Sequence, residues 1–323
     1  MDFNLTEEQQ MIQQAARDFA NAELLEGVIE RDNEQKFPYD AVKKMGEMGF
    51  LGMMVDPKYG GAGLDSVSYV LAMEEIAKID ASAAVVMSVN NSLVCAGLEK
   101  FCNEEQKMKY LKPLASGEVI GAFALSEPEA GSDATSQSTT AEDKGDYYLL
   151  NGTKNWITSG GNATYYIVIA QTDPEKKHKG INAFIVEKGW EGFVVGKKED
   201  KLGIRGSDTH SLMFTDVKVP KENRIGEDGF GFAFAMAVLN GGRIGIASQA
   251  LGIASGAYEL SLKYAKERKS FGTEIINHQA IAFKLADMHV NIMAARMLIY
   301  KAAAEKDEGK DISESGAMAK LYA

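Results

Sequence analysis

Residues 123–133, Phe-Ala-Leu-Ser-Glu-Pro-Glu-Ala-Gly-Ser-Asp, form a segment whose residue types could hold a polar ligand. The segment leaves a predicted strand and turns sharply at Pro128 and Gly131. In such a turn, the hydroxyls of Ser126 and Ser132 and the backbone N–H groups can donate hydrogen bonds to the carbonyls of a heterocycle. An ordinary surface loop has the same composition, so this segment alone does not establish a site.

The segment from Asn151 to Gly161 brings an aromatic ring close to a hydroxyl. Trp156 and Thr158 are separated by one residue, and the alternation of side chains along a strand would place both on one face. This pair suits a flat ring with polar edges. A core tryptophan beside a paired threonine is the simpler alternative.

Two arginines lie near predicted helix ends. Arg243 follows Asn240-Gly-Gly at the predicted head of a long helix. Arg268 and Ser270 lie where a helix is predicted to end, and Gln279 begins the next one. A forked guanidinium with hydroxyl and amide neighbours matches the geometry of a diphosphate. Solvated charges near helix ends are the alternative interpretation.

Several common kinds of site are excluded by spacing. The four histidines are scattered and have no metal-ligand spacing, so we predict no metal site. Cys95 and Cys102 lie in a helical pattern and are predicted to be buried free thiols. The sequence contains no G-x-G-x-x-G after a strand, no P-loop and no G-x-S-x-G. A nucleotide cofactor would have to be held in another way.

The hydrophobic periodicity divides the chain into helical, β and helical parts. The first part runs from Leu5 to about Leu114 and begins with a capping box at Thr6. Helices return from about Gly229, and apolar residues at steps of four and three in residues 281–299 form a seam that we interpret as packing within a helical bundle. The predicted strands between them are 121–125, 147–150, 155–158, 165–170, 183–186, 193–195 and 211–214.

Asn151-Gly152 lies between two of these strands and predicts a tight hairpin. Together the patterns predict an α+β protein with a helical N-terminal domain (residues 1–118), a central antiparallel β-barrel or sandwich domain (119–226) and a C-terminal helical bundle domain (227–323). Residues 313–323 indicate a helix that is still running, so we expect an incomplete bundle and a truncated C-terminus.

The composition is that of an ordinary globular protein, with 45% hydrophobic and 25% charged residues among 323. No uninterrupted apolar run reaches the ~18 residues of a membrane span, so we expect no membrane insertion. Residues 1–27 carry many acids and a single arginine, unlike a transit peptide, and we expect a cytoplasmic protein. The net charge of −11 disfavours nucleic acid, although local cations can still bind an anion.

The order and spacing of several segments make the whole chain similar to the acyl-CoA dehydrogenase family. These segments are Leu125 to Asp133, Trp156 to Thr158, Glu199 to Arg205, Gly242 to Gly252 and Arg268 to Gly272. Their common order is more specific than any single motif. The run from Gly242 to Gly252 most resembles the short-chain (butyryl-CoA) branch. The family's helical, β and four-helix-bundle domains agree with the pattern predicted from periodicity.

The resemblance implies a flavoprotein with FAD between the β domain and the C-terminal bundle. Ser126 would bond to the pyrimidine side of the flavin and Thr158 would lie near N5. The diphosphate held by the C-terminal part would belong to a neighbouring subunit, which implies a homodimer or homotetramer. The expected cofactor-binding residues are Phe123, Leu125, Ser126, Ser132, Trp156, Ile157, Thr158, Arg268, Ser270, Phe271 and Gln279. The expected substrate-binding residues are Ser132, Asn240, Gly241, Gly242 and Arg243.

The implied reaction is the α,β-dehydrogenation of a short-chain acyl-CoA to a trans-2-enoyl-CoA. Hydrogen bonds to the thioester carbonyl acidify the α-carbon, and a carboxylate takes the α-proton while the β-hydride passes to the flavin. Electrons then pass to an electron-transfer flavoprotein. An enoyl-CoA reductase, an acyl-CoA oxidase of the same fold and a non-catalytic flavin-binding subunit are the alternatives.

The catalytic base is not assigned to any residue of the chain. In most of the family it is a glutamate in a Tyr-Glu-Gly-Thr-like segment near the C-terminus. A minority branch carries it at the position that matches Gly242, where glycine cannot act as a base. We therefore expect the base beyond Ala323.

Overall fold

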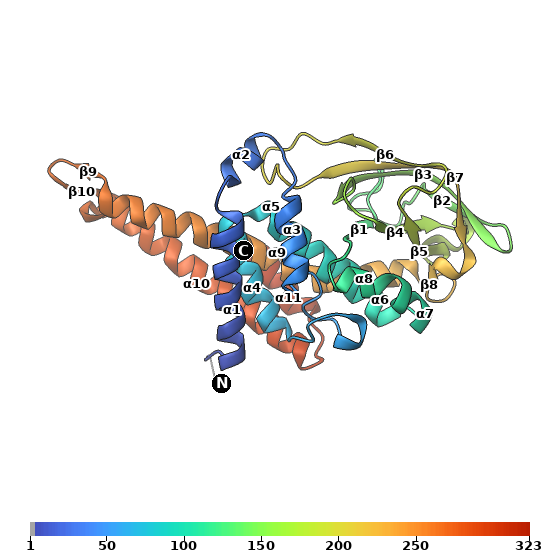
Figure 1. The fold of residues 1–323 in the computed structure, drawn as a ribbon, viewed down its shortest axis with the longest axis horizontal. Helices are drawn as coiled ribbons and strands as arrows, with labels where there is room; N and C mark the ends of the chain where they lie inside the picture. The colour runs from blue at the N-terminus through green and yellow to red at the C-terminus, as the bar shows by residue number, and fades with distance from the viewer. Residues whose placement is uncertain (1–3) are drawn as a thin grey trace. The chain divides into compact units, whose positions relative to one another are not determined.

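The computed structural model describes residues 4–323, and the contacts within it divide the chain into two compact units. Unit 1 comprises Met1–Val28, Asp65–Ala84 and Arg243–Ala323, and unit 2 comprises Ile29–Leu64 and Val85–Gly242. Along the chain, helices come first, strands follow and helices return, which confirms the predicted α+β order (Figure 1). The boundaries proposed for three domains remain predictions.

Unit 1 is helical. Its first helix begins as predicted, because the Thr6 side chain accepts a hydrogen bond from the backbone N–H of Gln9 and the Gln9 side chain accepts one from the N–H of Thr6. Gln279 begins α10, also as predicted. The elements are α1 (Glu7–Phe19), η1 (Ala20–Leu24), α4 (Ser66–Ile79), the second half of α9 (Gly231–Glu267), β9 (Lys269–Ser270), β10 (Thr273–Glu274), η7 (Ile275–Asn277), α10 (Gln279–Asp307) and α11 (Ser313–Tyr322).

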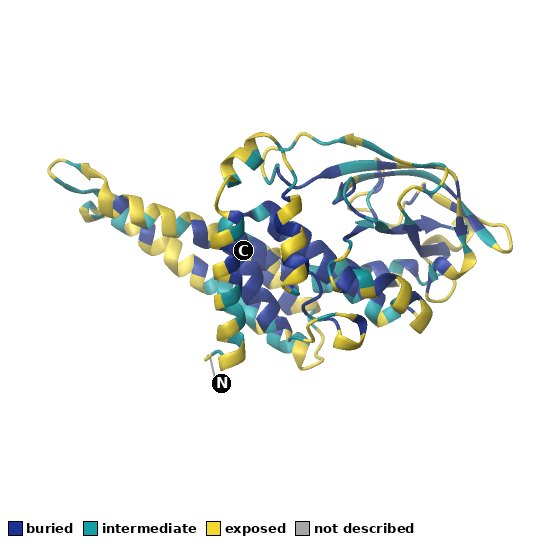
Figure 2. Ribbon diagram, viewed as in Figure 1, coloured by how far each residue is buried: buried dark blue, intermediate teal, exposed yellow. Residues whose placement is uncertain are grey.

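The apolar seam of α10 packs within unit 1, as we interpreted it. Leu285, Ile292, Ala295 and Ile299 are buried, whereas Met288 is 44% exposed. In Figure 2 the ends of α9 and α10 next to β9 and β10 are mostly exposed, and the halves nearer α4 are mostly buried. The buried packing therefore lies mainly in the half of α9 and α10 nearer α4.

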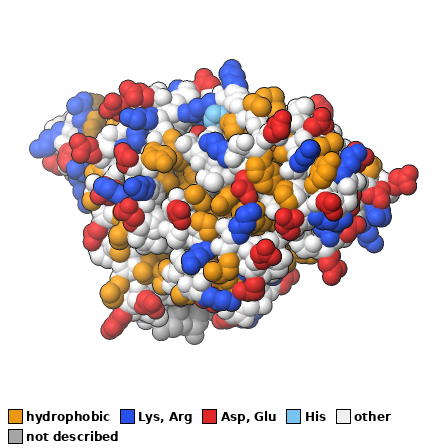
Figure 3. All heavy atoms as spheres, turned by 45° about the vertical axis from the view of Figure 1, so that its right-hand side comes forward, with side chains coloured by type: hydrophobic (Ala, Val, Ile, Leu, Met, Phe, Trp, Pro, Cys, Tyr) orange, Lys and Arg blue, Asp and Glu red, His pale blue; other side chains and the backbone are white. Residues whose placement is uncertain are grey.

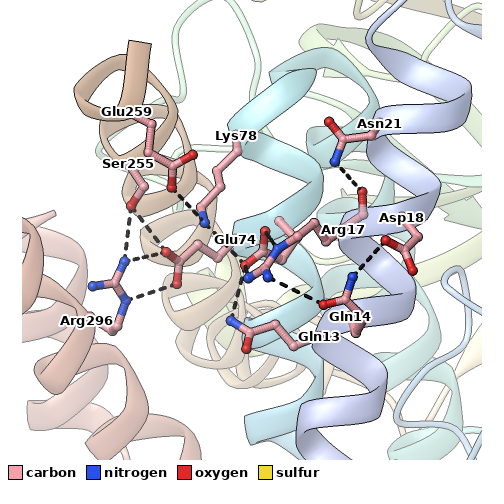
Figure 4. Close-up of polar contacts among 11 residues, drawn as sticks. Gln13, Gln14, Arg17, Asp18, Asn21, Glu74, Lys78, Ser255, Glu259 and Arg296 are labelled. Carbon is pink, nitrogen blue, oxygen red and sulfur yellow. Dashed lines mark hydrogen bonds and ion pairs between the residues drawn. The ribbon is translucent and has the colours of Figure 1, made fainter. Parts of the chain in front are cut away.

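Two adjacent carboxylates on α4, Glu74 and Glu75, are buried in unit 1. Figure 4 shows Glu74 facing Arg296 and Ser255. Glu74, which is 1% exposed, accepts from Arg296 Nη2 at 2.5 Å and from Arg296 Nε at 3.3 Å. The hydroxyl of Ser255 on α9 donates to the same carboxylate at 3.2 Å. A forked donor is the partner that a buried carboxylate requires, so Glu74 ties α4 to α9 and α10.

Glu75 makes the corresponding connection to α1. Arg17 Nε and Nη2 donate to its two oxygens at 3.1 and 3.0 Å, and Lys78 Nζ lies 3.2 Å from Oε1. Burial alone would raise the pKa of Glu75, but Arg17 and Lys78 outweigh it and hold the pKa below the ordinary 4.5. Glu75 is therefore an anion that stabilises the helical packing.

Unit 2 consists of one large sheet with helices on one face. Its helical elements, including two that begin at or before the boundary with unit 1, are α2 (Val28–Asn33), α3 (Tyr39–Glu47), η2 (Pro57–Tyr59), α5 (Ala81–Ser88), η3 (Val89–Cys95), α6 (Ala96–Phe101), α7 (Glu104–Gln106), η4 (Lys107–Leu111), α8 (Lys112–Ala115), η5 (Pro174–Gly180), η6 (Lys221–Asn223) and the first turns of α9. The strands are β1 (Gly121–Ala124), β2 (Thr140–Asp143), β3 (Tyr147–Thr158), β4 (Tyr165–Gln171), β5 (Ile181–Glu187), β6 (Phe193–Lys198), β7 (Thr209–Pro220) and β8 (Arg224–Ile225).

The strand order is β6-β7-β3-β2-β4-β5-β8, and β1 pairs with β4. Most pairings are antiparallel, but β1 and β2 each run parallel to β4. The predicted purely antiparallel sheet is therefore corrected to a mixed one. Parallel neighbours need a long connection between them, and residues 125–164, which include β2 and β3, provide it between β1 and β4.

The sheet encloses one core and covers another. Alternate residues of β4 serve the two sides: Tyr166 and Val168 pack inside the folded sheet, and Ile167 and Ile169 pack against the helices. Inside, the rings of Tyr148 and Phe184 lie 4.9 Å apart, which joins β3 to β5 across the core. Both faces of β4 are therefore fixed, which makes it a rigid support for its neighbour β1.

The predicted hairpin at Asn151-Gly152 is wrong. Both residues lie inside the 12-residue strand β3, at an irregularity in its pairing with β7 between Leu150 and Gly152. Gly152 has φ 144°, and a Cβ there would lie 2.5 Å from Thr139 Oγ1. The glycine permits a bulge and a close approach of two backbones, and the hairpin turn lies earlier in the chain, between Asp143 and Tyr147.

The predicted helix start at Arg243 is also wrong. Arg243 lies inside α9, which begins at Gly231 and continues to Glu267. The pair Gly241-Gly242 does not interrupt the helix, and a Cβ at Gly242 would lie 2.7 Å from Leu93 Cδ2. Close packing against Leu93 therefore explains a glycine that the sequence alone indicated as a helix boundary.

Residues 81–101 form a helical stretch that is long and apolar enough to cross a membrane by length and composition. However, 78% of its most apolar window is buried inside the protein, as in the core helix of a globular domain.

Cys95 and Cys102 are free and buried, as predicted, and burial raises the pKa of both thiols.

We expect Glu75→Gln to destabilise the protein by about 1–2 kcal/mol at pH 7, because it removes a charge-assisted pair whose arginine is partly solvated. Since the folded-state pKa of Glu75 is lowered, this stability is present above pH 4.5 and is lost as the pH falls through that lowered pKa. Urea unfolding at pH 7 and pH 4 measures the effect. The difference from wild type should narrow at pH 4, and the exposed Glu191→Gln is the control. A difference that does not change with pH would contradict the assignment.

Candidate functional site

A buried ammonium group fixes the start of the segment that follows β1. Lys154 of β3 has a fully buried side chain, and its Nζ donates to the carbonyl of Leu125 at 3.1 Å, to Glu127 Oε1 at 2.6 Å and to the side chain of Gln137. All three donors of the ammonium are thereby satisfied. Burial lowers the pKa of Lys154 to about 8, with Glu127 acting in the opposite direction.

Glu127 completes the connection from the other side. Its Oε2 accepts from the backbone N–H and the hydroxyl of Ser138 at 2.7 and 2.6 Å, and its Oε1 accepts from the N–H of Thr139 at 3.1 Å. Burial would raise the pKa of Glu127, but Lys154 and these donors lower it. One buried ion pair thus binds the backbone at both ends of residues 125–139 through hydrogen bonds.

The strand is distorted at Trp156. Its pairing with β7 shifts between Lys154 and Ile157, and Trp156 has φ 62°. A left-handed backbone is rare for an aromatic residue and stores about 1–3 kcal/mol of strain. The indole is 63% exposed, Ile157 is buried and Thr158 is half-buried. Trp156 and Thr158 therefore lie on either side of a buried residue, in a bulge that the sequence did not indicate, and their joint role at a ligand stays a prediction.

A second buried carboxylate holds the turn that follows. Asp208 Oδ2 accepts from the backbone N–H of Gly161 at 2.6 Å and of Asn162 at 3.0 Å, and the carbonyl of Asp208 accepts from the N–H of Ser159 at 2.8 Å. Ser159 is another left-handed residue, with φ 61°. Lys154 and Asp208 thus anchor the strained stretch at its two ends.

The unit 2 residues predicted to hold the flavin lie in two neighbouring segments of the chain. Ser126 is joined to the Trp156 segment because its carbonyl accepts from the N–H of Asn155 at 2.9 Å. Leu125 is buried, Phe123 pairs with Ile167 in the sheet, and Ser132 is exposed in the loop beyond. Within residues 4–323, the side chains of Ser126, Trp156 and Thr158 make no hydrogen bond, so their donors are available to a ligand.

The predicted diphosphate residues lie together in unit 1, where α9 ends. Arg268 follows the last residue of α9 as predicted, Gln279 begins α10, and both are exposed. The carbonyl of Arg268 accepts from the N–H of Ile275 at 2.8 Å, and the carbonyl of Ser270 lies 3.2 Å from His278 Nε2. Within the described part of the chain, the guanidinium of Arg268 has no partner.

The connection between α9 and α10 is a hairpin that the sequence did not indicate. Strands β9 and β10 are joined by Phe271 and Gly272, which have φ 53° and 80°. Two consecutive left-handed residues match the twist of a tight hairpin. The ring of Phe271 is 97% exposed, which is an unusual position for a phenylalanine.

The predicted substrate stretch lies within α9. Asn240, Gly241 and Gly242 are the last residues of unit 2, and Arg243 is the first of this stretch assigned to unit 1. All are half-buried. A Cβ placed at Gly241 would have no heavy atom of the described residues within 4 Å, so a ligand can approach the helix backbone at that position.

The surface charge is mixed on the face that Figure 3 shows. Hydrophobic side chains gather there among Lys, Arg, Asp and Glu side chains of both signs. The net charge of −11 therefore does not produce a uniformly negative surface on this face, and cations remain available locally.

A separate cleft of about 550 Å³ in unit 2 is lined by residues such as Phe37, Ile120 and Asn162 rather than by the predicted site residues.

The sequence interpretation missed the residues that hold the site. Lys154, Glu127 and Asp208 are buried charges, and none was selected. One signal was available, because Tyr148, Leu150 and Lys154 share the inward parity of β3. A lysine at an inward position needs a buried partner. The identity of that partner depends on the loop, which periodicity does not predict.

Models of three acyl-CoA dehydrogenase domains match the chain. The N-terminal domain matches residues 6–118, the middle domain residues 122–217 and the C-terminal domain residues 229–323. A short-chain-specific acyl-CoA dehydrogenase of Clostridium acetobutylicum is 49% identical over 323 residues, which cover 100% of this chain and 85% of that protein.

Solved structures give the same result. Butyryl-CoA dehydrogenase from Megasphaera elsdenii superposes with a TM-score of 0.98 at 48% identity, covering 100% of this chain and 85% of the other. A chain from a structure of the electron transferring flavoprotein of Acidaminococcus fermentans also reaches a TM-score of 0.98, at 51% identity and with the same coverage.

We expect Asp208→Ala to destabilise the protein by about 1.5–3 kcal/mol, the range for hydrogen bonds to a charged group, because it removes the acceptor of two backbone N–H groups. Asp208→Asn keeps one acceptor oxygen and should cost less. Thermal and urea unfolding measure the loss, with the exposed Asp216→Asn in β7, the strand that follows Asp208, as the control. Equal stability of Asp208→Ala and the control would show that Asp208 does not hold the turn.

Proposed function

The chain belongs to the acyl-CoA dehydrogenase family, and we propose that it dehydrogenates short-chain acyl-CoA thioesters to trans-2-enoyl-CoA with FAD as its cofactor. The observation that carries this proposal is the 49% identity to a short-chain-specific enzyme over the whole chain. The electron acceptor is an electron-transfer flavoprotein, consistent with the 51%-identical chain in a structure of such a protein. The proposed cellular location is the cytoplasm.

The residues of unit 2 fit the ring of FAD. When bound, FAD supplies the ring that accepts a hydride from the β-carbon of the substrate. The hydroxyls of Ser126 and Thr158 would donate hydrogen bonds to the polar edge of that ring, and the exposed Trp156 would pack beside it. Phe123, Leu125 and Ile157 complete the segment by packing into the sheet, so the donors keep their positions.

The residues of unit 1 fit the diphosphate. The unpartnered guanidinium of Arg268 offers two parallel donors, and Ser270 and Gln279 add a hydroxyl and an amide. The exposed Phe271 supplies an apolar surface next to them. We assign these groups to the FAD of a neighbouring subunit, so the functional protein is a homodimer or homotetramer.

The substrate contacts are assigned to Ser132 and to residues 240–243 of α9. The exposed hydroxyl of Ser132 can bond to the thioester part of the ligand. At Gly241, where no heavy atom of the described residues would lie within 4 Å of a Cβ, an acyl-CoA can approach the helix. Exclusion of water from this region strengthens the hydrogen bonds that acidify the α-carbon. The base that takes the α-proton is not among the residues assigned here.

Anaerobic titration of the purified full-length protein with acyl-CoAs of increasing length tests the proposal. The protein should purify yellow, release FAD on denaturation, and lose its flavin absorbance with butyryl-CoA before longer thioesters. Added electron-transfer flavoprotein should restore the colour. Tightly bound NAD or FMN would reject the cofactor, and recovery of colour with oxygen alone would favour an oxidase.

We expect Arg268→Lys to weaken FAD binding by about 1.5–3 kcal/mol, or roughly 10- to 150-fold in Kd, because lysine cannot form the paired hydrogen bonds. Fluorescence titration of the apo-protein with FAD measures the change. Lys266→Arg, an exposed cation near the end of the same helix, is the matched control. An unchanged Kd for Arg268→Lys at several salt concentrations would make Arg268 a solvated charge.

A further inference from the structure

The ion pair of Lys154 and Glu127 is completely closed off from solvent. Both side chains are fully buried, and their charged atoms lie 2.6 Å apart. Replacing a buried ion pair with neutral groups is often neutral or stabilising, because both charges must be removed from water. A reason for this pair other than stability should therefore be visible in what the two side chains hold.

The pair holds two backbone segments at one point. Lys154 lies on β3, two residues before Trp156, and its ammonium binds the carbonyl of Leu125, the residue before Ser126. Glu127 is the residue after Ser126, and its carboxylate also binds the backbone of Ser138 and Thr139. Ser126 is thus enclosed between two contacts of the same ion pair.

The strained tryptophan is anchored to the same point. The N–H of Asn155, between Lys154 and Trp156, donates to the carbonyl of Ser126 at 2.9 Å. Trp156 keeps φ 62° while its indole is 63% exposed, so packing of the indole does not enforce that conformation. A strained backbone conformation persists where the surrounding contacts enforce it. Here the hydrogen bonds of Lys154 hold the chain before Trp156, and the hydrogen bonds of Asp208 hold the chain after Ser159.

We propose that Lys154 and Glu127 are positioning residues for the flavin: they set the distance and orientation between the Ser126 hydroxyl and the Trp156–Thr158 edge. The inference rests on the proposed function, in which that edge holds the flavin ring. Neither residue touches the ring. Their effect is transmitted through the carbonyl of Leu125, the carbonyl of Ser126 and the backbone of Asn155.

The test separates positioning from stability. Lys154→Met keeps an unbranched side chain that is one atom shorter but leaves Glu127 as a buried carboxylate without its ammonium partner, so it should lower the melting temperature of the apo-protein. The double variant Lys154→Met with Glu127→Gln removes that unpaired charge and keeps an acceptor for Ser138 and Thr139. Its melting temperature should recover much of the loss.

Binding of FAD to the apo-protein and the visible spectrum of the bound flavin are the positioning readouts. We expect the double variant to bind FAD about tenfold more weakly or worse, equivalent to about 1.4 kcal/mol, with shifted flavin bands. Val219→Ala, a fully buried change in the same β core, is the control: it should lower the melting temperature and leave the flavin bands in place. Recovery of both FAD affinity and spectrum in the double variant would overturn the inference.

Thr158→Val distinguishes failure of the inference from failure of the proposed function. It removes a hydroxyl assigned to the flavin and leaves the ion pair intact. If Thr158→Val weakens FAD binding and the double variant does not, the flavin site stands and the positioning role is wrong. If neither variant changes FAD binding, the site itself is wrong.

Discussion

Trp156 must keep a backbone conformation that aromatic residues rarely adopt, inside a strand whose other residues build a core. The distortion is local: the pairing with β7 slips between Lys154 and Ile157 and is regular again at Thr158. A strand that slipped freely would turn its buried residues outward. The buried charges on either side oppose this. Moving Lys154 would leave Glu127 as a buried carboxylate without its ammonium partner, and moving Asp208 would leave two backbone N–H groups without their acceptor. The exposed indole is thus a consequence of buried electrostatics.

Buried charges have different uses in the two units. In unit 1, Glu74 and Glu75 meet guanidinium forks that partly reach solvent, and each pair joins one helix to another. In unit 2, Lys154 and Glu127 are closed off entirely, and they join a loop to a strand. Helices can also be joined by apolar seams, as α10 shows at Ile292 and Ile299. A loop with little apolar surface has no such option, so directional hydrogen bonds must hold it.

The order of helices and strands could be predicted because periodicity is local: the capping box at Thr6 and the start of α10 at Gln279 needed only neighbouring residues. The errors arose where distant contacts decide. Gly152 is a bulge because Thr139 approaches it, and Gly242 is helical because Leu93 packs on it. The site was predicted through motif residues such as Ser126 and Thr158, whose roles in binding remain predictions. Asp208 was missed because it accepts from backbone N–H groups, which no side-chain pattern reveals. Glu127 was missed because its partners, Lys154 and Ser138, lie far from it along the chain.

An acidic chain that binds an anionic cofactor must confine its cations. With a net charge of −11, attraction at long range is unfavourable, so specificity has to come from short, directional contacts. The two proposed halves of the site meet this condition in different ways. At the flavin edge, neutral donors are fixed by charges that solvent does not reach, so salt and substrate cannot screen them. At the end of α9, the guanidinium of Arg268 is exposed and unpartnered among the described residues. An exposed charge is screened by water and salt, so this guanidinium alone attracts an anion only weakly. The specificity proposed for Arg268 therefore has to come from the paired, directional hydrogen bonds that its fork can donate to a diphosphate.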